Sequence, residues 1–447
     1  EPLSNYLVAR ARKDGDRGRS SVGGMITAVN RQLTSDPLET ALRSSAYAGG
    51  ADFRLESPSR AWALVGSAAY SRVAGSPEAM IAVQTSGNHF FQRPDATHLG
   101  VDRNATSLTG YSVGAQITRQ GGRHWRGNLA LAATSPAFEV NDLGYQNRTD
   151  RRDIATSVTY QENQPGSFLR NYAVNGSVRY EHNFDWQPIQ VRHSVQLNYR
   201  TLGFWNGSAS ITHMGRAYSD RNTRGGPLIQ RPEDWQARLN LGSDSRKPVF
   251  VSVTLNGLSD EYDGWNAGLD VATFIRTSPR WNIQIGPSFT KGLIPAQYVA
   301  TIADPSATAT YGKRYLFAPL RQTTLAMETR FNFTFTPRLS LELYAQPFLS
   351  SGDYLDVGSL DAPGGFTFTP YAGQAPNRDF NYRSLRGTGV LRWEYRPGST
   401  LYLAWQQSMD DRAMGVGDFD FSRDTQALFR ARPDNVFVLK ASYWFPM

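Results

Sequence analysis

Residues 325–348 read LAMETRFNFTFTPRLSLELYAQPF and predict a two-faced β-hairpin. Apolar side chains recur at alternate positions on both sides of Thr336-Pro337-Arg338, and polar ones such as Glu328 and Arg330 lie between them. Successive side chains of a β-strand point to opposite faces of the sheet, so the two sets take opposite faces. The Thr-Pro-Arg segment interrupts the pattern and predicts the tight turn that joins the two strands.

The same alternation recurs in segments of about 9 to 16 residues through nearly the whole 447-residue chain. Clear examples are 189–200, 235–241, 249–256 and 281–285. No helical pattern accompanies them that would cover the apolar faces, and no apolar run approaches the ~20 residues of a membrane helix. Transmembrane strands alternate lipid-facing and lumen-facing residues. The sequence therefore predicts an all-β fold, a large antiparallel transmembrane β-barrel that occupies residues 1–447 as one domain.

The composition agrees with this class. Aromatic residues make up 12% of the chain, with 21 Tyr, 23 Phe and 10 Trp, which fits two interfacial aromatic girdles. Cysteine is absent, so disulfides, thiolate metal sites and cysteine nucleophiles are excluded. The formal charge of +8 comes from dispersed basic residues with acidic ones between them, and we expect no nucleic-acid partner.

Short and long connections largely alternate along the chain. Short ones include 57–60, 121–123, 278–280 and 336–338, whereas long ones span about 75–105, 137–150, 217–232, 352–382 and 410–433. Outer-membrane barrels show this asymmetry, with short periplasmic turns and long extracellular loops. We count roughly 19 to 20 strands, of which the first, Asn5–Lys13, and the last both run inward.

An odd strand count has a consequence for closure, because bacterial single-chain barrels normally have even numbers. An odd strand count, together with a first strand that runs inward, places Glu1 in an extracellular loop. We expect this chain to be the C-terminal major part of a longer protein. One or more upstream strands, or a partner chain, would then complete the barrel.

The C-terminal segment resembles a barrel assembly signal. Phe437, Leu439, Tyr443 and Phe445 alternate toward an aromatic end, although Pro446 and Met447 follow. We therefore expect the barrel assembly machinery to be a partner.

Several stretches together resemble one family. They include GGMITAVNR (23–31), HFFQRPDATHL (89–99), the segment 124–153, SRKP (245–248), PAQYVAT (295–301), the hairpin segment 334–348 and 385–407. The chain is similar to the β-barrel domain of unknown function found in large bacterial outer-membrane proteins. Members carry an N-terminal carbohydrate-binding domain of the family-nine type. The resemblance implies a sugar-related role and offers no catalytic residues.

Inward-facing charges are the best functional candidates. Rings of such side chains tune selectivity in wet pores, although cross-strand ion pairs that stiffen the wall would use the same residues. The candidates are Arg192, Arg200, Arg238, Glu328, Arg330, Glu342, Arg392 and Glu394.

The sequence offers weak signals for chemistry. Gly110–Gly114 matches GxSxG, but this motif needs a strand-to-helix turn, and here it lies inside an alternating segment. We interpret it as a chance match and predict no enzyme and no cofactor. The histidines form no zinc-binding pattern. Acidic residues at 260–263, 353–361 and 410–420 would suit a loop-bound divalent cation, but solvated loop charge explains them better.

Ser76-Pro77-Glu78 has the cap, first-turn proline and acidic residue of a helix start, so we predict a short helix over 79–91. This loop would fold into the lumen, cover the mouth of the barrel or, more simply, pack on its own barrel rim, which is the interpretation we favour. Phe90, Phe91 and Arg93 are its candidate contacts.

The leading functional interpretation is a porin-like channel or transport-type protein of the bacterial outer membrane, for glycans or other bulky substrates. The alternative is an anchor or scaffold for a periplasmic carbohydrate-binding domain and its partners. A barrel-wall hydrolase is the weakest candidate. Outer-membrane lipid and lipopolysaccharide are the expected surroundings.

Overall fold

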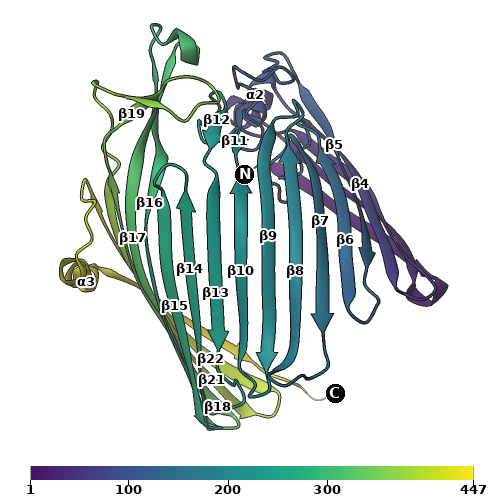
Figure 1. The fold of residues 1–447 in the computed structure, drawn as a ribbon, viewed down its shortest axis with the longest axis vertical. Coiled ribbons are helices and arrows are strands. Elements are labelled where there is room, and N and C mark those ends of the chain that lie inside the picture. Colours follow the sequence, from purple (N-terminus) through teal and green to yellow (C-terminus); the bar gives the residue numbers. More distant parts are fainter. Residues whose placement is uncertain (1, 446–447) are drawn as a thin grey trace.

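The computed structural model describes residues 2–445, which form a curved wall of antiparallel strands (Figure 1). The strands are β1 (Leu3–Gly15), β2 (Ser20–Gln32), β3 (Ser45–Glu56), β4 (Trp62–Ala74), β5 (Ser107–Arg119), β6 (Trp125–Thr134), β7 (Arg151–Glu162), β8 (Leu169–His182), β9 (Pro188–Thr201), β10 (Asn206–Gly215), β11 (Ala217–Ser219), β12 (Ile229–Arg231), β13 (Asp234–Gly242), β14 (Val249–Asp260), β15 (Trp265–Ser278), β16 (Trp281–Ala303), β17 (Lys313–Thr336), β18 (Leu339–Tyr354), β19 (Gly358–Leu360), β20 (Phe368–Pro370), β21 (Phe380–Arg396), β22 (Ser399–Met414) and β23 (Pro433–Ser442). The helices are α1 (Asp36–Ala41), α2 (Pro77–Thr85) and α3 (Phe421–Arg430).

The main sheet has 21 strands, of which β19 and β20 form a short flap beside β17. The other nineteen pair with their neighbours in chain order, each antiparallel to the next. The predicted all-β antiparallel fold and the predicted strand count are confirmed. β11 and β12 pair with each other in a separate ribbon.

The edges of the sheet are β1 and β23. Among the described residues, β1 pairs with β2 alone and β23 pairs with β22 alone. The sheet is not seen to close on itself, and the hypothesis that additional strands complete it stays a prediction.

The two ends of the strands carry different connections. Short turns, such as those after β1, β15, β17 and β21, gather at one end, which we call the turn rim. The long loops and α2 gather at the other end, the loop rim (upper part of Figure 1). The predicted alternation of short and long connections is therefore correct.

Strand register gives the sheet an apolar face and a polar face. In the hairpin of β17 and β18, Phe331 lies opposite Leu343 and Phe333 opposite Leu341, whereas Asn332 lies opposite Glu342 on the other face. Pairing carries the same division from strand to strand, as the cross-strand pair Leu197 and Ala209 shows on the apolar side. The face assignment made from residues 325–348 thus holds beyond that hairpin.

Apolar side chains along the apolar face remain exposed. Val195 is 57% and Ile211 is 58% exposed in the middle of β9 and β10. Exposed aromatic residues flank this band near both ends of the strands: Trp62, Trp125 and Trp393 toward the turn rim, and Tyr70, Trp235 and Trp265 toward the loop rim. Two aromatic belts around an apolar band are what two membrane interfaces favour.

Buried apolar residues gather in small clusters where loops and helices pack on the sheet. Met80 of α2 packs with Val29 and Val73. Tyr315 and Phe317 pack beneath the flap that carries Leu360. Burial therefore fixes the loops to the wall.

The helices differ in part from the prediction. α2 starts where expected, because Ser76 accepts a hydrogen bond from the N–H of Ala79 and Pro77 follows the cap. It ends at Thr85 rather than near Phe91, since Ser86 takes an extended conformation.

The expectation that no helix covers the apolar face is wrong at one place, because α3 packs on it through Leu428, which contacts Leu349 and Met409 (Figure 1). Asp420 caps α3 by accepting from the N–H of Arg423, so the start of the helix has a local cause. None of the helices in residues 2–445 has the length and hydropathy needed to cross a membrane.

The exposed apolar face predicts a lipid-facing surface, and adjacent positions on β9 test it. Val195→Arg places a charge at mid-height on the apolar face and should lower the free energy of unfolding in lipid vesicles by about 2–4 kcal/mol. Gln196→Arg places the same charge on the polar face and should change it by less than about 1 kcal/mol. Urea unfolding followed by tryptophan fluorescence measures both, and equal losses would contradict the assignment.

Candidate functional site

The eight charged residues predicted to line a lumen all occupy the polar face. Arg238 lies opposite Ser210, and Ser340 opposite Arg392. The others follow the same register: Arg192 and Arg200 on β9, Glu328 and Arg330 on β17, Glu342 on β18 and Glu394 on β21. The polar face therefore brings together side chains from five strands.

Ion pairing divides this set. Arg330 donates to Glu328 at 2.6 Å, and Arg392 lies 3.7 Å from Glu394. Arg192, Arg200 and Arg238 are exposed and make no ion pair within the described part of the chain. The set therefore contains both paired charges and exposed arginines, and the roles in selectivity and in stiffening the wall both stay predictions.

Between these arginines the polar face carries amides and hydroxyls. Asn240 donates to Thr254 at 2.8 Å, and Gln196 donates to Asn198 at 3.1 Å. A hollow of about 470 Å³ opens on this face toward the turn rim, and its lining includes Asn171, Asn198, Arg200, Asn206 and Asn240. Such a surface offers many neutral donors and acceptors.

At the loop rim, four connections interlock into what we call the loop cluster: residues 75–106, 135–150, 183–187 and 216–233. α2 anchors it on the polar face, where Met80 is fully buried. Gly110 of β5 is also needed there, because a Cβ atom at this position would lie 2.2 Å from the backbone nitrogen of Phe138. The predicted packing of the first long loop on the rim is correct.

His89 and Glu139 join two loops of the cluster. The Nε2 atom of His89 lies 2.9 Å from Glu139 Oε2, and Nδ1 lies 2.8 Å from the carbonyl oxygen of Pro136. Glu139 also accepts from the N–H of Asn141 at 2.6 Å. Burial alone would raise the pKa of Glu139, but the hydrogen bonds from His89 and Asn141 outweigh it and lower the pKa.

His98 joins the first long loop to two others. Its Nε2 atom lies 2.8 Å from Asp150 Oδ1, and Nδ1 lies 2.8 Å from Asp185 Oδ2. Burial would lower the pKa of His98, but the hydrogen bonds and charges of these two carboxylates outweigh it and raise the pKa. Asp185 also accepts from Thr97 Oγ1 at 2.7 Å.

Two arginines fasten the centre of the cluster. Arg148 lies 3.1 Å from Glu181 and 2.9 Å from Asp220. Arg221 donates to the carbonyl oxygens of Gly87, Asn88 and Asn147. Burial, and then the charge of Arg148, lowers the pKa of Arg221 to about 10. The cluster is thus an ordered structure over part of the loop rim.

The predicted loop contacts have distinct positions. Phe91 and Arg93 are buried, and Arg93 pairs with Asp95 at 3.2 Å. Phe90 lies 5.7 Å from the guanidinium of Arg221. All three serve the packing of the cluster.

The acidic loop residues are used locally. Asp260 accepts from the N–H groups of Tyr262 and Gly264, and Glu261 pairs with Arg216. Asp418 pairs with Arg423 at 2.8 Å, and Asp410 accepts from Arg386. Within residues 2–445, no three or more histidine or acidic side chains are grouped as a metal ion requires.

Ser112 of the GxSxG match lies inside β5, opposite Ala69 on β4 and Thr134 on β6. Its hydroxyl lies 3.0 Å from Thr134 Oγ1. This is the straight strand that the sequence predicted, without the strand-to-helix turn of a nucleophile elbow.

The residues of the predicted C-terminal assembly signal are exposed. Phe437 lies opposite Trp405 and Leu439 opposite Leu403, on the apolar face. Tyr443 and Phe445 follow the strand, with their rings 4.5 Å apart. The final Pro446 and Met447 lie outside the described residues.

Comparison with known proteins gives the family. A model of a domain of unknown function, DUF5916, matches residues 1–446. The chain belongs to the DUF5916 family. A search of the curated proteins found no relative of this DUF5916 chain.

Solved structures similar to the DUF5916 chain include two receptors and an outer membrane channel. The siderophore receptor PirA from Acinetobacter baumannii is 8% identical over 94% of this chain and 73% of its own, with a TM-score of 0.45. The outer membrane channel DcaP of Acinetobacter baumannii is 11% identical over 78% and 90%, with a TM-score of 0.30. The ferric enterobactin receptor PfeA from Pseudomonas aeruginosa is 9% identical over 98% and 72%, with a TM-score of 0.36.

The loop cluster was missed by sequence reasoning, because its contacts join residues far apart in the chain. His98 and Asp185 are an example, and so are Arg221 and Gly87. The local signal was the helix start at Ser76. It predicts the helix in the first long loop, but it does not predict which residues of the other loops this loop contacts.

His98 predicts a pH dependence of the loop cluster. Because its folded pKa is raised, its stabilising contribution is fully present below about pH 6.5, the unfolded value, and is lost as the pH rises through the folded pKa. Amide exchange of residues 97–100, corrected for its intrinsic pH dependence, should therefore be slower at pH 6 than at pH 9. In His98→Gln this difference should vanish, and an unchanged difference would refute the role of His98.

Proposed function

We propose that this chain forms most of the wall of an outer-membrane β-barrel that conducts solutes. The observation that supports this is the continuous exposed apolar face between two aromatic belts. A soluble protein rarely exposes contiguous apolar surface of this extent. Lipid covers such a face without a second protein layer, because strands in a sheet satisfy their backbone hydrogen bonds among themselves.

Glycans are the proposed solute class. Sugar hydroxyls donate and accept hydrogen bonds and carry no charge, and the amides and hydroxyls of β8 to β13 on the polar face match that chemistry. The hollow beside Arg200 lies within this surface. The three unpaired arginines add a preference for solutes with acidic groups.

We propose that the barrel closes through additional strands. β1 and β23 both run from the loop rim to the turn rim, so they cannot pair antiparallel with each other. An odd number of strands between them restores antiparallel pairing on both sides. We propose that an N-terminal segment or a partner chain supplies them, and that the barrel assembly machinery recognises β23 and the aromatic residues after it.

The second candidate function is an anchor for a periplasmic carbohydrate-binding domain and its partners. The unpaired edges of β1 and β23 favour it, because a strand edge is a ready template for pairing with another chain. An anchor needs no open passage, whereas a channel does.

Conductance separates the two candidates. The full-length protein in planar bilayers should give discrete current steps with a preference for anions. Replacing Arg192, Arg200 and Arg238 together by Gln should reduce that anion preference, because these cations have no internal partner. Replacing the exposed Arg17, Arg60 and Arg280 at the turn rim is the matched control. Absence of current, with stable co-purifying proteins, would favour the anchor.

We also propose that the GxSxG match has no catalytic role. Ser112→Ala removes the hydroxyl and leaves the strand intact, so any hydrolysis of ester substrates by the purified protein should be unchanged. A loss of about 100-fold or more would mean that Ser112 is a nucleophile.

A further inference from the structure

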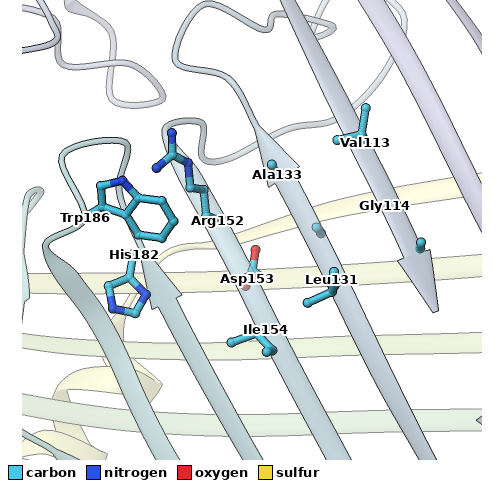
Figure 2. A pocket seen from close by; sticks show the side chains of 11 residues that line it. Val113, Gly114, Leu131, Ala133, Arg152, Asp153, Ile154, His182 and Trp186 are labelled. Carbon is cyan, nitrogen blue, oxygen red and sulfur yellow. The ribbon is translucent and has the colours of Figure 1, made fainter. Parts of the chain in front are cut away.

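A hollow on the apolar face has features of a lipid site. It has a volume of about 570 Å³ and crosses β5 to β8 near the loop rim (Figure 2). Cross-strand register aligns Val113, Ala133, Arg152 and His182 in one row. The next row toward the turn rim contains Leu131 and Ile154. The lining is mostly apolar and includes small residues such as Ala133, and Asp153 is its one acidic residue.

Arg152 introduces a cation at the upper end of this hollow. Its guanidinium lies 4.2 Å from the ring centre of Phe184 and 4.3 Å from that of Trp186. Figure 2 shows Arg152 beside the indole, with Ile154 farther along the same strand. Two aromatic rings therefore hold the guanidinium in place.

This guanidinium lacks an anionic partner. Its Nη1 atom is buried without a hydrogen bond, and no carboxylate of residues 2–445 pairs with it. The neighbouring Asp153 is on the polar face, where it pairs with Arg151 and Arg179 at 2.7 Å each. Arg152 as a whole is half-buried, so its charge is partly withdrawn from water without a carboxylate partner, and the position suits an external anion.

The height of Arg152 on the wall identifies the source of that anion. Tyr160, in the aromatic belt toward the turn rim, lies eight residues farther along β7. This is about 27 Å along the strand at ~3.4 Å per residue, or roughly 21 Å of height at a barrel-strand tilt of ~40°. The apolar band of an outer-membrane barrel is ~25 Å tall. Arg152 therefore lies near the upper edge of this band, and the 68% exposed Trp186, beyond the end of β8, suits the interface at the loop rim.

We propose that this hollow binds a phosphorylated lipid of the outer leaflet. The phosphate accepts hydrogen bonds from Arg152, and an acyl chain lies over Val113, Ala133 and Ile154. A planar guanidinium matches phosphate oxygens, and a chain in the hollow covers apolar surface that a free anion would leave open. The proposal rests on the membrane placement in the proposed function, but not on conduction.

Lipid titration of the full-length protein in detergent, read by native mass spectrometry, tests the site. The probes are a diphosphorylated glucosamine lipid, the same lipid without phosphates, and inorganic phosphate. Arg152→Ala should weaken binding of the phosphorylated lipid about tenfold or more and leave the dephosphorylated lipid unaffected. Ala133→Trp fills the hollow and should weaken both lipids. Arg280→Ala, which removes an exposed cation at the turn rim, should weaken neither.

Three outcomes would overturn the proposal. The first is that Arg152→Ala and Arg280→Ala bind the phosphorylated lipid equally well. The second is that the wild type binds both lipids equally. The third is that millimolar inorganic phosphate displaces the phosphorylated lipid, which would indicate a simple anion site. If Arg152→Ala does not fold, the Arg152→Gln variant is used in its place, because Gln keeps a planar polar group between the rings.

The lipid readout needs no current, so it separates this proposal from the proposed function. A protein that retains the phosphorylated lipid but conducts nothing refutes only the channel. A protein that conducts but does not distinguish the two lipids refutes only the lipid site.

Discussion

Backbone pairing between neighbouring strands is the constraint on which the rest of this structure depends. A strand that contacts lipid must satisfy every N–H and C=O group within the protein, because hydrocarbon offers no hydrogen-bonding partner. Nineteen strands meet this requirement by pairing each with the next. Their side chains then alternate between two faces, apart from local register shifts such as those between β16 and β17, so strand pairing determines both the apolar surface and the polar surface. β1 and β23 are the exceptions, since each pairs on one side only.

Pairing also explains why so much of the fold was predictable from the sequence. The alternation in 325–348 is local, and a slip of one residue in register would place Phe331 and Phe333 on the polar face. The short turns are local too, since Thr336-Pro337-Arg338 closes the hairpin where the pattern stops. Strand number, direction and face all follow from such local signals. The helix start at Ser76 was predictable for the same reason, because the cap, the proline and the acidic residue are neighbours.

The parts that were not predictable depend on contacts across the chain. α3 has a local cap at Asp420, but its place on the apolar face depends on Arg383, which pairs with Asp424 at 3.0 Å from a strand about forty residues earlier. The loop cluster is similar: His98 needs Asp150 and Asp185, which the sequence does not align with it. The eight polar-face charges show the intermediate case. Alternation assigned their face, but only side-chain geometry separates the paired Arg330 from the unpaired Arg238.

An arginine needs different partners on the two faces, and this difference explains the surroundings of the arginines on each face. On the polar face Arg192 and Arg238 are exposed, so water can accept their hydrogen bonds. On the apolar face a cation meets hydrocarbon unless it lies at an interface, which confines it to the rims. Arg383 meets this demand with two carboxylates beneath α3. Arg152 has two aromatic rings instead, which attract its charge but do not neutralise it. The same residue type on the same face thus reaches two solutions, and only the second leaves the charge without a carboxylate partner in residues 2–445.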